Sequence, residues 1–206
     1  TDSHLQGSPT TAAAQELGLP LYTFDTALEA MREGRLKYDL GLSVLYWRKL
    51  RDEFLSIPTL GTINFHPALL PEYKGTGGYN LAIMDELDQW GNTAHYVDAS
   101  IDTGEIIEVD RFPIAAETET AQSLERKTMQ ALEPFAQRII ARAIESKTKL
   151  PTTPNIGGRY VSRDEMEAMK QILDGDNIEK KIRAFWFPPY DGAYVEINGQ
   201  KYTLIN

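Results

Sequence analysis

Apolar and polar positions recur along the chain with two different periods, and the period predicts the type of element. Apolar residues that recur every three or four positions predict helices, and short, nearly continuous apolar runs predict strands in a buried sheet. The helical pattern covers residues 10–17, 27–32, 79–87 and 121–146. The strand pattern covers residues 21–24, 40–46, 61–65, 93–97 and 105–112. This alternation of strands and helices predicts an α/β fold with a mostly parallel sheet.

Local signals predict where some of these helices begin. Ser8 followed by Pro9 is typical of a helix start, because serine caps the first turn and proline needs no N–H partner there. Thr26 is predicted to cap the second helix. The stretch 121–146 keeps apolar residues on one face and predicts a long amphipathic helix that Pro134 could bend.

The chain changes character after residue 149. Residues 151–158 are rich in Pro, Thr and Gly and predict a linker. We therefore expect a core over residues 1–149 and a small C-terminal subdomain over residues 150–206. The elements expected in the subdomain are a helix over 166–173 behind a Ser162–Glu165 capping box, a helix over 178–185, and a hairpin over 194–205 that turns at Asn198-Gly199.

The predicted hairpin needs a partner, because two strands alone are only marginally stable in water. We expect it either to extend the main sheet or to pair with a copy of itself across a dimer axis. The sequence therefore suggests a homodimer formed through the C-terminal hairpin.

Composition narrows the possible functions. The 206 residues are 42% apolar and 25% charged, which is ordinary for a globular protein with a sizeable core. The absence of cysteine excludes disulfides, thiol nucleophiles and thiolate metal sites, and it suggests a cytoplasmic protein. A net charge of −9 argues against broad nucleic-acid binding, and no apolar run reaches the length of about 18 residues that spans a membrane. A small-molecule ligand remains open.

Three residues with polar side chains in the middle part of the chain are candidate catalytic residues. Asn64 and His66 lie two positions apart on a predicted strand and therefore share a face. Asp102 ends a later predicted strand before a glycine turn, so its carboxylate could reach the imidazole. The carboxyl end of a parallel strand opens onto the crevice where α/β proteins bind ligands. We therefore expect the three groups to converge there.

An amide, an imidazole and a carboxylate at one point suit the transfer of an acyl group to an amine. The Asn64 amide and a protonated His66 could donate to the oxyanion that forms. Asp102 could orient His66 and relay the proton that the amine loses. Each residue also has a structural interpretation when taken singly: His66 as a satisfied strand residue, and Asn64 and Asp102 as turn or strand-end residues.

The pattern around these residues resembles the signature of the folate-dependent formyltransferases. That signature is an Asn-x-His-Pro-x-Leu-Leu-Pro run followed by Asp-x-Gly near the end of a later strand, and residues 64–71 and 102–104 match it. The resemblance implies a Rossmann-like formyltransferase core, 10-formyltetrahydrofolate as the formyl donor, no metal, and the same three residues as the catalytic set. It also implies a cis peptide bond between Leu70 and Pro71.

The resemblance further implies a site for the pterin ring of the donor. One wall would be the loop that carries Trp47, Arg48, Lys49 and Leu50, and the other would be the segment that begins at Asp98. Backbone amides would bind the edge of the ring, and apolar side chains would cover its faces. The alternative is that Trp47 and Leu50 only pack in the core and that the two basic residues lie on a solvated face.

The acceptor amine is suggested by the C-terminal part of the chain. Methionyl-tRNA formyltransferases carry a basic C-terminal domain, whereas this sequence is acidic and its residues 182–194 resemble the branch that modifies nucleotide sugars. A dTDP- or UDP-linked amino sugar, as used in O-antigen and lipopolysaccharide biosynthesis, is therefore the expected acceptor. The residues expected to bind it are Lys74, Tyr79, His95, Trp186 and Tyr190.

Several of these assignments have competing interpretations. The aromatic C-terminal run could be a small core that docks the hairpin, and His95 could support the catalytic residues or be a hydrogen-bonded strand residue. The acceptor could instead be methionyl-tRNA or glycinamide ribonucleotide, or the protein could hydrolyse formyltetrahydrofolate. A non-catalytic folate- or nucleotide-binding module is the candidate from a different class.

The resemblance also implies a difference at the N-terminus. Members of the family begin with a strand, a helix and a second strand before the segment that matches residues 1–18. We therefore expect the sheet of this chain to lack one βαβ unit.

Overall fold

The computed structural model describes residues 8–46 and 48–206, and it confirms the expected α/β class. The helices are α1 (Pro9–Glu16), α2 (Phe24–Arg32), α3 (Asp52–Leu55), α4 (Gly78–Met84), α5 (Ala121–Ser146), α6 (Arg163–Met169) and α7 (Ile178–Phe185). The strands are β1 (Gly41–Val44), β2 (Thr62–His66), β3 (Tyr73–Gly75), β4 (Gln89–Tyr96), β5 (Ile106–Pro113), β6 (Arg159–Val161), β7 (Tyr194–Ile197) and β8 (Gln200–Thr203).

The central sheet has four strands in the order β1-β2-β4-β5. β1 and β2 are parallel, β4 is antiparallel to β2, and β5 is antiparallel to β4. The sheet is thus mixed rather than parallel throughout, because β4 and β5 are joined by a short loop, which permits only antiparallel pairing, whereas a parallel pair needs a long crossover. The sequence pattern located these strands but did not indicate the direction of the last two.

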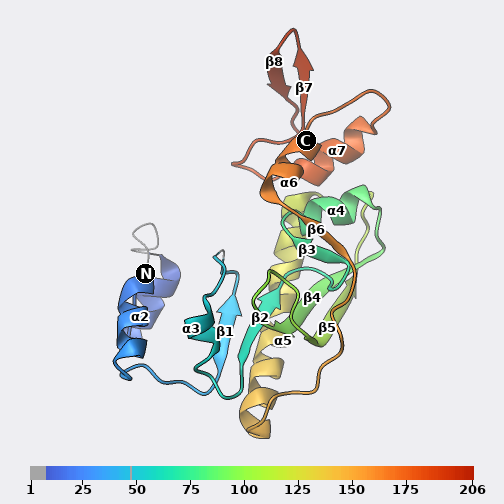
Figure 1. Cartoon of the computed structure of the whole chain (residues 1–206). Helices are drawn as coiled ribbons and strands as arrows, with labels where there is room; N and C mark the ends of the chain where they lie inside the picture. Colours follow the sequence, from blue (N-terminus) through green and yellow to red (C-terminus); the bar gives the residue numbers. More distant parts are fainter. Residues whose placement is uncertain (1–7, 47) are drawn as a thin grey trace.

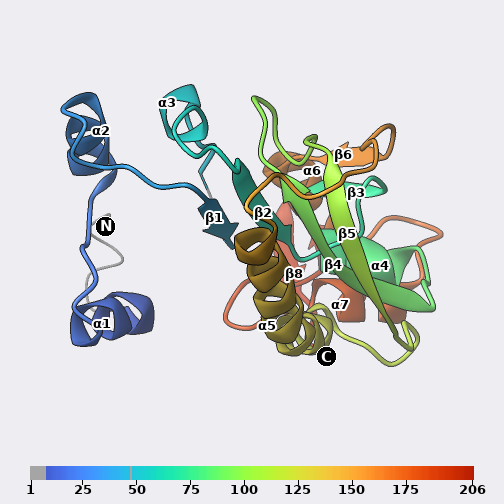
Figure 2. The ribbon, with the colours of Figure 1, turned by 90° about the horizontal axis from the view of Figure 1, so that it is seen from below.

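The long helix α5 covers one face of this sheet (Figure 2). Its bounds match the sequence prediction, and it continues through Pro134. Ile63 and Phe65 of β2 belong to the same buried cluster as Phe135 of α5, and the two phenylalanine rings meet edge to face. Because side chains alternate along a strand, the residues between Ile63 and Phe65, and beyond them, face the other side of the sheet.

The predicted strand at residues 21–24 is wrong. Phe24 is the first residue of α2, and Thr23 is its N-cap instead of the predicted Thr26. Thr26 takes part in the cap from inside the helix, because its hydroxyl accepts from the Thr23 N–H while Thr23 accepts from the Thr26 N–H. This reciprocal capping stabilises a helix start, whereas a strand would need a neighbouring strand, and residues 21–23 have none among the described residues.

The segment between β2 and α4 contains the short strand β3, which pairs in parallel with β6. β6 comes directly after the Pro/Gly-rich segment 151–158. The chain therefore contacts the first part of the molecule again at β3, as soon as this segment ends (Figure 1). Ala184 and Phe185 of α7 lie in one buried cluster with Trp90 of β4. The division of the chain after residue 149 stays a prediction, and these contacts join its two parts.

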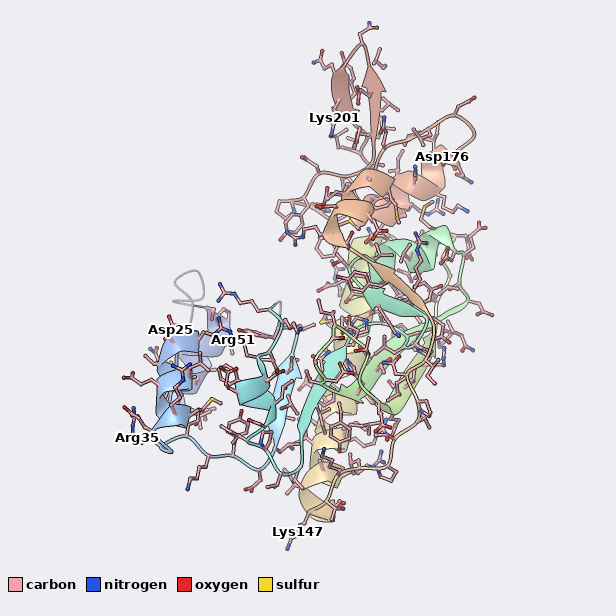
Figure 3. The ribbon with its side chains drawn as sticks, in the orientation of Figure 1. Asp25, Arg35, Arg51, Lys147, Asp176 and Lys201 are labelled. Atoms are coloured by element: carbon pink, nitrogen blue, oxygen red, sulfur yellow. The ribbon has the colours of Figure 1, made fainter. Side chains whose placement is uncertain are left out.

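The C-terminal elements agree with the sequence pattern. α6 begins at the predicted capping box of Ser162 and Glu165, although it ends at Met169, and α7 has the predicted bounds. β7 and β8 form a separate two-stranded sheet that projects from the body of the molecule, with Lys201 on it (Figure 3). The hairpin does not extend the central sheet.

At the other end of the molecule, α1 and α2 lie beyond β1 (Figures 1 and 2). A cavity of about 400 Å³ lies there, lined by residues of α2, β1 and α3. None of the helices in residues 8–46 and 48–206 combines the length with the apolar character needed to cross a bilayer.

Candidate active site

The three candidate catalytic residues converge. Asn64 and His66 lie on the face of β2 opposite α5, and Asp102 lies in the loop that joins β4 to β5. Asp102 has a left-handed backbone conformation with φ of 54°, which aspartate tolerates better than most residues. Gly104 allows the loop to fold back closely, since a Cβ at this position would lie 1.8 Å from the carbonyl oxygen of Tyr96. The Asp-x-Gly part of the motif therefore places the carboxylate by backbone geometry.

The carboxylate of Asp102 lies between β2 and the loop after it. Its Oδ1 is 3.6 Å from Nδ1 of His66, and its Oδ2 accepts a hydrogen bond of 2.9 Å from the Gly75 N–H. The other ring nitrogen of His66, Nε2, donates to the carbonyl of Tyr73 over 2.9 Å. The Leu70–Pro71 peptide bond in the loop between these groups is cis, as the resemblance implied.

His95 belongs to the same group of residues. It lies directly opposite Asn64 in the antiparallel pair of β2 and β4, and its side chain is almost completely buried. Its Nε2 is 3.0 Å from the amide nitrogen of Asn64 and 3.7 Å from Oδ1 of Asp102. Its Nδ1 lies 2.8 Å from the carbonyl oxygen of Tyr96.

Burial of the His66 ring affects its pKa. Desolvation lowers the pKa of the ring from its ordinary value of 6.5, although the charge of Asp102 and the hydrogen bond to Tyr73 act in the opposite direction. The lowered pKa favours a neutral imidazole at pH 7 in the free protein, and donation from a protonated ring to the oxyanion stays a prediction. Burial also raises the pKa of Asp102, but the contacts with His95 and His66 and the Gly75 N–H outweigh it and hold this pKa below the ordinary 3.8.

A small cavity of about 120 Å³ opens beside this group. Four of the residues predicted to bind the donor line it together with Asn64, His95 and Asp102; these four are Arg48, Lys49, Leu50 and Asp98. Trp47, the fifth, lies outside the described residues. The Asp98 carboxylate accepts from the N–H of Ser100 and the hydroxyl of Thr103, so it shapes the loop that forms one wall.

The small cavity has the chemistry that a flat heterocycle requires. Tyr46 and Ile101 line it and remain partly exposed, so their apolar surfaces are available to cover the faces of a ring. The loop backbone at residues 97–102 lies along the same wall and supplies polar groups for the edge of a ring. The residues present therefore fit a pterin.

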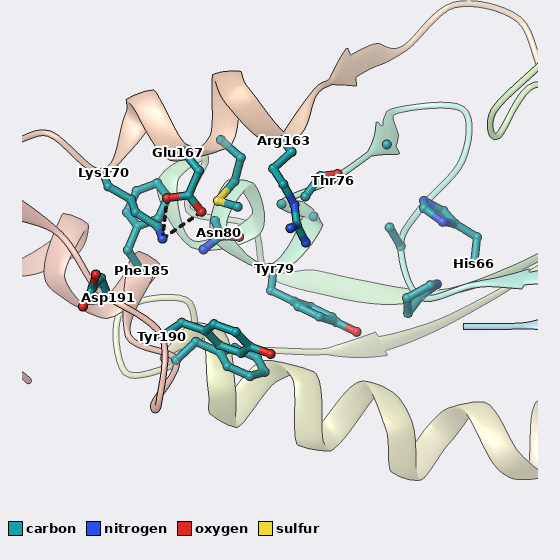
Figure 4. Close-up of a pocket in the computed structure, with 17 residues that line it drawn as sticks. His66, Thr76, Tyr79, Asn80, Arg163, Glu167, Lys170, Phe185, Tyr190 and Asp191 are labelled. Atoms are coloured by element: carbon teal, nitrogen blue, oxygen red, sulfur yellow. Dashed lines mark hydrogen bonds and ion pairs between the residues drawn. The ribbon is translucent and has the colours of Figure 1, made fainter. Parts of the chain in front are cut away.

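A larger cavity of about 420 Å³ lies on the other side of His66. Aromatic side chains from three elements or loops line it, and in Figure 4 Tyr79 lies between His66 and Tyr190. Phe187 contributes a further ring. Burial raises the pKa of the Tyr79 hydroxyl above its usual range, so that hydroxyl stays protonated at neutral pH.

The structure brings only part of the predicted acceptor-binding set to this cavity. Tyr79 and Tyr190 line it. Lys74 is buried and donates to the carbonyl of Gly157 over 2.8 Å, so its side chain links β3 to the loop before β6 instead. His95 lines the small cavity, and Trp186 lines neither of the two.

The sequence reasoning missed one wall of the larger cavity. α6 and the residue after it contribute Arg163, Met166, Glu167 and Lys170 (Figure 4). Lys170 is buried and pairs with the exposed Glu167 at 2.8 Å. The spacing of these four residues, i, i+3, i+4 and i+7, places them on one helix face, and this spacing was the signal available in the sequence.

The arrangement provides a hydrogen-bond donor, a base and a carboxylate at the junction of two cavities. Asn64 has amide N–H groups, His66 is a neutral ring, and Asp102 is an ionised carboxylate next to it. Such a set can stabilise a developing oxyanion and take up a proton. Within the described residues, no group of three or more His, Asp or Glu side chains is placed to bind a metal ion.

Solved structures with the same fold include N-formyltransferases. A 4-N formyltransferase from Francisella tularensis superposes with a TM-score of 0.77 at 22% identity, over 97% of this chain and 83% of the other. An N-formyltransferase from Helicobacter canadensis, solved in complex with folinic acid and dTDP-3-aminofucose, superposes with a TM-score of 0.69 at 26% identity, over 91% of this chain and 67% of the other.

The curated relatives with similar sequences are methionyl-tRNA formyltransferases. Methionyl-tRNA formyltransferase of Methylacidiphilum infernorum is 31% identical over 175 residues, which is 82% of this chain and 53% of that protein. The corresponding protein of Paracoccus denitrificans is 29% identical over 207 residues, which is 96% of this chain and 66% of that protein. The chain thus spans between half and two thirds of the length of these relatives.

The chain also matches a family model. The match is to the family described as formyl transferase, and it covers residues 6–140. These residues include β1, β2, β4 and β5 and the whole set of Asn64, His66 and Asp102. Because the match covers well over half of the chain, the protein belongs to the formyl transferase family.

Proposed function

We propose that the protein transfers a formyl group from 10-formyltetrahydrofolate to the primary amine of a dTDP- or UDP-linked amino sugar. The observation that carries this proposal is the position of Asn64, His66 and Asp102 between two cavities of different character. A transfer between two substrates needs two sites that meet at the reacting atoms. The smaller cavity suits the donor, and the larger one suits the acceptor.

The chemistry of the smaller cavity supports the donor assignment. Its apolar walls and its loop backbone match a bicyclic ring with hydrogen-bonding groups on its edge. We assign Arg48, Lys49, Leu50 and Asp98 to this site, and Trp47 remains part of the assignment as a prediction. The Helicobacter canadensis relative was solved with folinic acid, a formylated folate, which supports the same class of donor.

The chemistry of the larger cavity supports the acceptor assignment. Tyr79, Phe187 and Tyr190 offer ring faces on which a nucleobase can stack. Arg163 is exposed and offers a fork of N–H donors that matches a diphosphate. The cavity ends at His66, where the amine would lie. The Helicobacter canadensis relative was solved with a dTDP-linked amino sugar.

The residues then have distinct roles in the reaction. The amine nitrogen attacks the formyl carbon, and the formyl oxygen gains negative charge that an N–H of Asn64 stabilises. The neutral His66 takes up the proton that the amine loses, and the carboxylate of Asp102 stabilises the resulting imidazolium. The bond from the formyl carbon to the donor nitrogen then breaks, and that nitrogen is protonated as tetrahydrofolate leaves.

The test is an assay of the purified protein with 10-formyltetrahydrofolate and a panel of dTDP- and UDP-linked amino sugars. We expect a formamide product with at least one sugar, and a rate about 100-fold lower with the Asn64→Ala variant, because one donor to the oxyanion is lost. The absence of product across the whole panel would overturn the assignment of the acceptor.

A second candidate acceptor is methionyl-tRNA, because the curated relatives carry that name. The net charge of −9 opposes it, since binding to tRNA depends on contacts between basic groups and phosphates. Formylation of methionyl-tRNA in the same assay, with all sugars unreactive, would favour this candidate.

Each remaining candidate function gives a different result with the same formyl donor. A glycinamide ribonucleotide transformylase would formylate that ribonucleotide, and a formyltetrahydrofolate hydrolase would release formate without any amine. A non-catalytic binding module would bind the folate and release neither product.

We further propose that two copies associate through the β7–β8 hairpin. Ile197 and Tyr202 are exposed, and together with Val195 they lie on one face of the hairpin, because Val195 is paired directly with Tyr202. A hairpin that projects alone is only marginally stable, and burial of this apolar face against a second copy would stabilise it.

A further inference from the structure

His95 is a buried side chain that the proposed mechanism does not use. It is 2% exposed, and it lies next to a step in register between β4 and β5 at Ala94 and His95. Such an irregularity redirects a side chain and often occurs beside functional sites. The ring of His95 faces Asn64 across the strand pair, so the register of the sheet itself creates the contact.

The partners of His95 define its proton positions. Nδ1 lies 2.8 Å from the carbonyl oxygen of Tyr96, which can only accept, so Nδ1 carries a proton. When the ring is neutral, Nε2 then has no proton and can accept from the amide nitrogen of Asn64, which lies 3.0 Å away. Both contacts are satisfied together by a neutral ring protonated at Nδ1.

This neutral ring decides which end of the Asn64 amide faces it. The oxygen and nitrogen ends of an asparagine side chain have nearly the same shape, so packing alone does not select between them. A lone pair on Nε2 accepts from the nitrogen end and repels the oxygen end. One N–H of Asn64 then binds His95, and the second remains for the formyl oxygen.

We propose that His95 is a positioning residue that keeps Asn64 oriented as a hydrogen-bond donor to the reacting oxygen. The proposal rests on the proposed formyl transfer, because the formyl oxygen is the group that Asn64 would bind. It separates the two histidines by role: His66 exchanges a proton, and His95 keeps its proton on Nδ1 throughout.

The competing state is a protonated His95. Two titratable groups among the described residues face its ring: Asp102, with Oδ1 at 3.7 Å from Nε2, and His66, with ring centres 6.4 Å apart. A proton on Nε2 would donate to Asp102 or to the oxygen end of Asn64, and the amide would turn over. The two states therefore predict opposite orientations of Asn64.

The kinetic test compares His95→Leu and His95→Gln with the wild type, each also in the Asn64→Ala background. Loss of an oriented oxyanion donor costs on the order of 100-fold in rate, so we expect His95→Leu to lower kcat by about that factor with the KM values of both substrates unchanged. His95→Gln offers a carbonyl oxygen that accepts from Asn64, and we expect it to keep most of kcat. In the Asn64→Ala background His95→Leu should cause no further loss, because the interaction is already absent.

Two kinetic results would overturn the proposal. One is an equal loss from His95→Leu with and without Asn64, which would indicate a general structural role. The other is a loss from His95→Gln as large as that from Asn64→Ala. Thermal unfolding of each variant shows whether it folds. If His95→Leu does not fold, the kcat of His95→Gln alone tests the proposal.

A spectroscopic test does not depend on turnover, so it stays informative if the proposed function fails. The chain has only three histidines, and ¹⁵N spectra of the imidazole nitrogens distinguish the two neutral tautomers from the imidazolium. The signals that disappear in His95→Gln identify His95. We expect a neutral ring protonated at Nδ1 at pH 7, and an imidazolium or an Nε2-protonated ring would overturn the inference.

Discussion

At the scale of single residues, the site depends on atoms whose hydrogen-bonding roles the backbone determines. Carbonyl groups of Tyr73 and Tyr96 each accept from one nitrogen of a histidine ring, and the N–H of Gly75 donates to Asp102. The second nitrogen of His66 is left to exchange a proton, and the second nitrogen of His95 is left to accept from Asn64. The backbone contacts thus assign the orientation of three titratable side chains before any substrate arrives.

Asp102→Asn tests the proposed role of the carboxylate. The amide keeps the shape of the side chain but cannot stabilise a positively charged His66, so uptake of the proton should be slowed. We expect kcat to fall by about 10²- to 10⁴-fold, with little change in thermal stability. Steady-state kinetics at pH 7 measures the change. If the variant retained wild-type kcat, Asp102 would be only a turn residue.

The titration of His66 predicts a pH dependence of stability. Its pKa in the folded protein lies below 6.5, so the unfolded chain binds more protons than the folded one as the pH falls below that value. Stability should therefore decrease as the pH falls below 6.5, with a slope of at most about 1.4 kcal/mol per pH unit from this group. Asp102 adds a second loss as the pH falls below 3.8 towards its lowered pKa.

Urea unfolding between pH 5 and 8 checks this dependence, and the His66→Ala variant is the control. The variant should lose the part of the slope that lies just below pH 6.5. An identical slope in the two proteins would show that burial does not perturb this ring.

At the scale of elements, loops and helix faces place functional side chains beside the central sheet. The loop between β4 and β5 carries Asp102, and its close approach to β4 depends on Gly104. One face of α6 forms a wall of the larger cavity. The sequence predicted β4, β5 and α6 as elements. It did not indicate which parts of the chain these elements would contact.

Gly104→Ala should destabilise the protein and reduce its activity. The added Cβ would lie 1.8 Å from the Tyr96 carbonyl oxygen, so the loop must move and carry Asp102 with it. We expect a loss of about 1–3 kcal/mol in the free energy of unfolding. Gly192→Ala is the matched control, because its added Cβ meets neighbours no closer than 3.4 Å. Equal unfolding free energies for the two variants would contradict the prediction.

Arg163→Ala should weaken binding of the acceptor. If Arg163 binds a diphosphate in the larger cavity, its loss should raise the KM of the nucleotide sugar about tenfold and leave the KM of the formyl donor unchanged. Arg159→Ala, four residues earlier on β6 and outside the cavity, is the control. A similar effect from both variants would point to general electrostatic attraction instead.

At the scale of the whole molecule, the hairpin projects from the body and leaves an apolar face exposed, although Tyr194 at its base bonds the backbone of Lys170 and Ile172. We expect a homodimer in solution that the Ile197→Glu variant dissociates, because a buried charge on the apolar face opposes association. Light scattering across a range of protein concentrations measures the mass. Glu196→Lys, on the opposite face of the hairpin, is the control and should stay dimeric. A monomeric wild type would overturn the proposed dimer.

The sequence predicted the positions of helices and strands better than it predicted which strands pair with one another. α5, α7 and the hairpin turn at Asn198-Gly199 follow from local signals, namely caps, periodicity and turn residues, and the structure confirms them. The strand at 21–24 failed because a short apolar run without a neighbouring strand loses to the capping pair of Thr23 and Thr26. Local patterns succeed where the interactions that stabilise an element lie within it.

The sequence by itself determined the candidate reacting groups of this protein, because Asn64, His66 and Asp102 lie in a motif whose spacing specifies a strand, a loop and a turn. Only the tertiary structure decided what surrounds them. The antiparallel pairing of β4 with β2 brings His95 to Asn64, and the packing of the C-terminal segment places the face of α6 across from Tyr79. These contacts join residues far apart in the chain, and they depend on strand direction, register and burial, none of which a local pattern encodes.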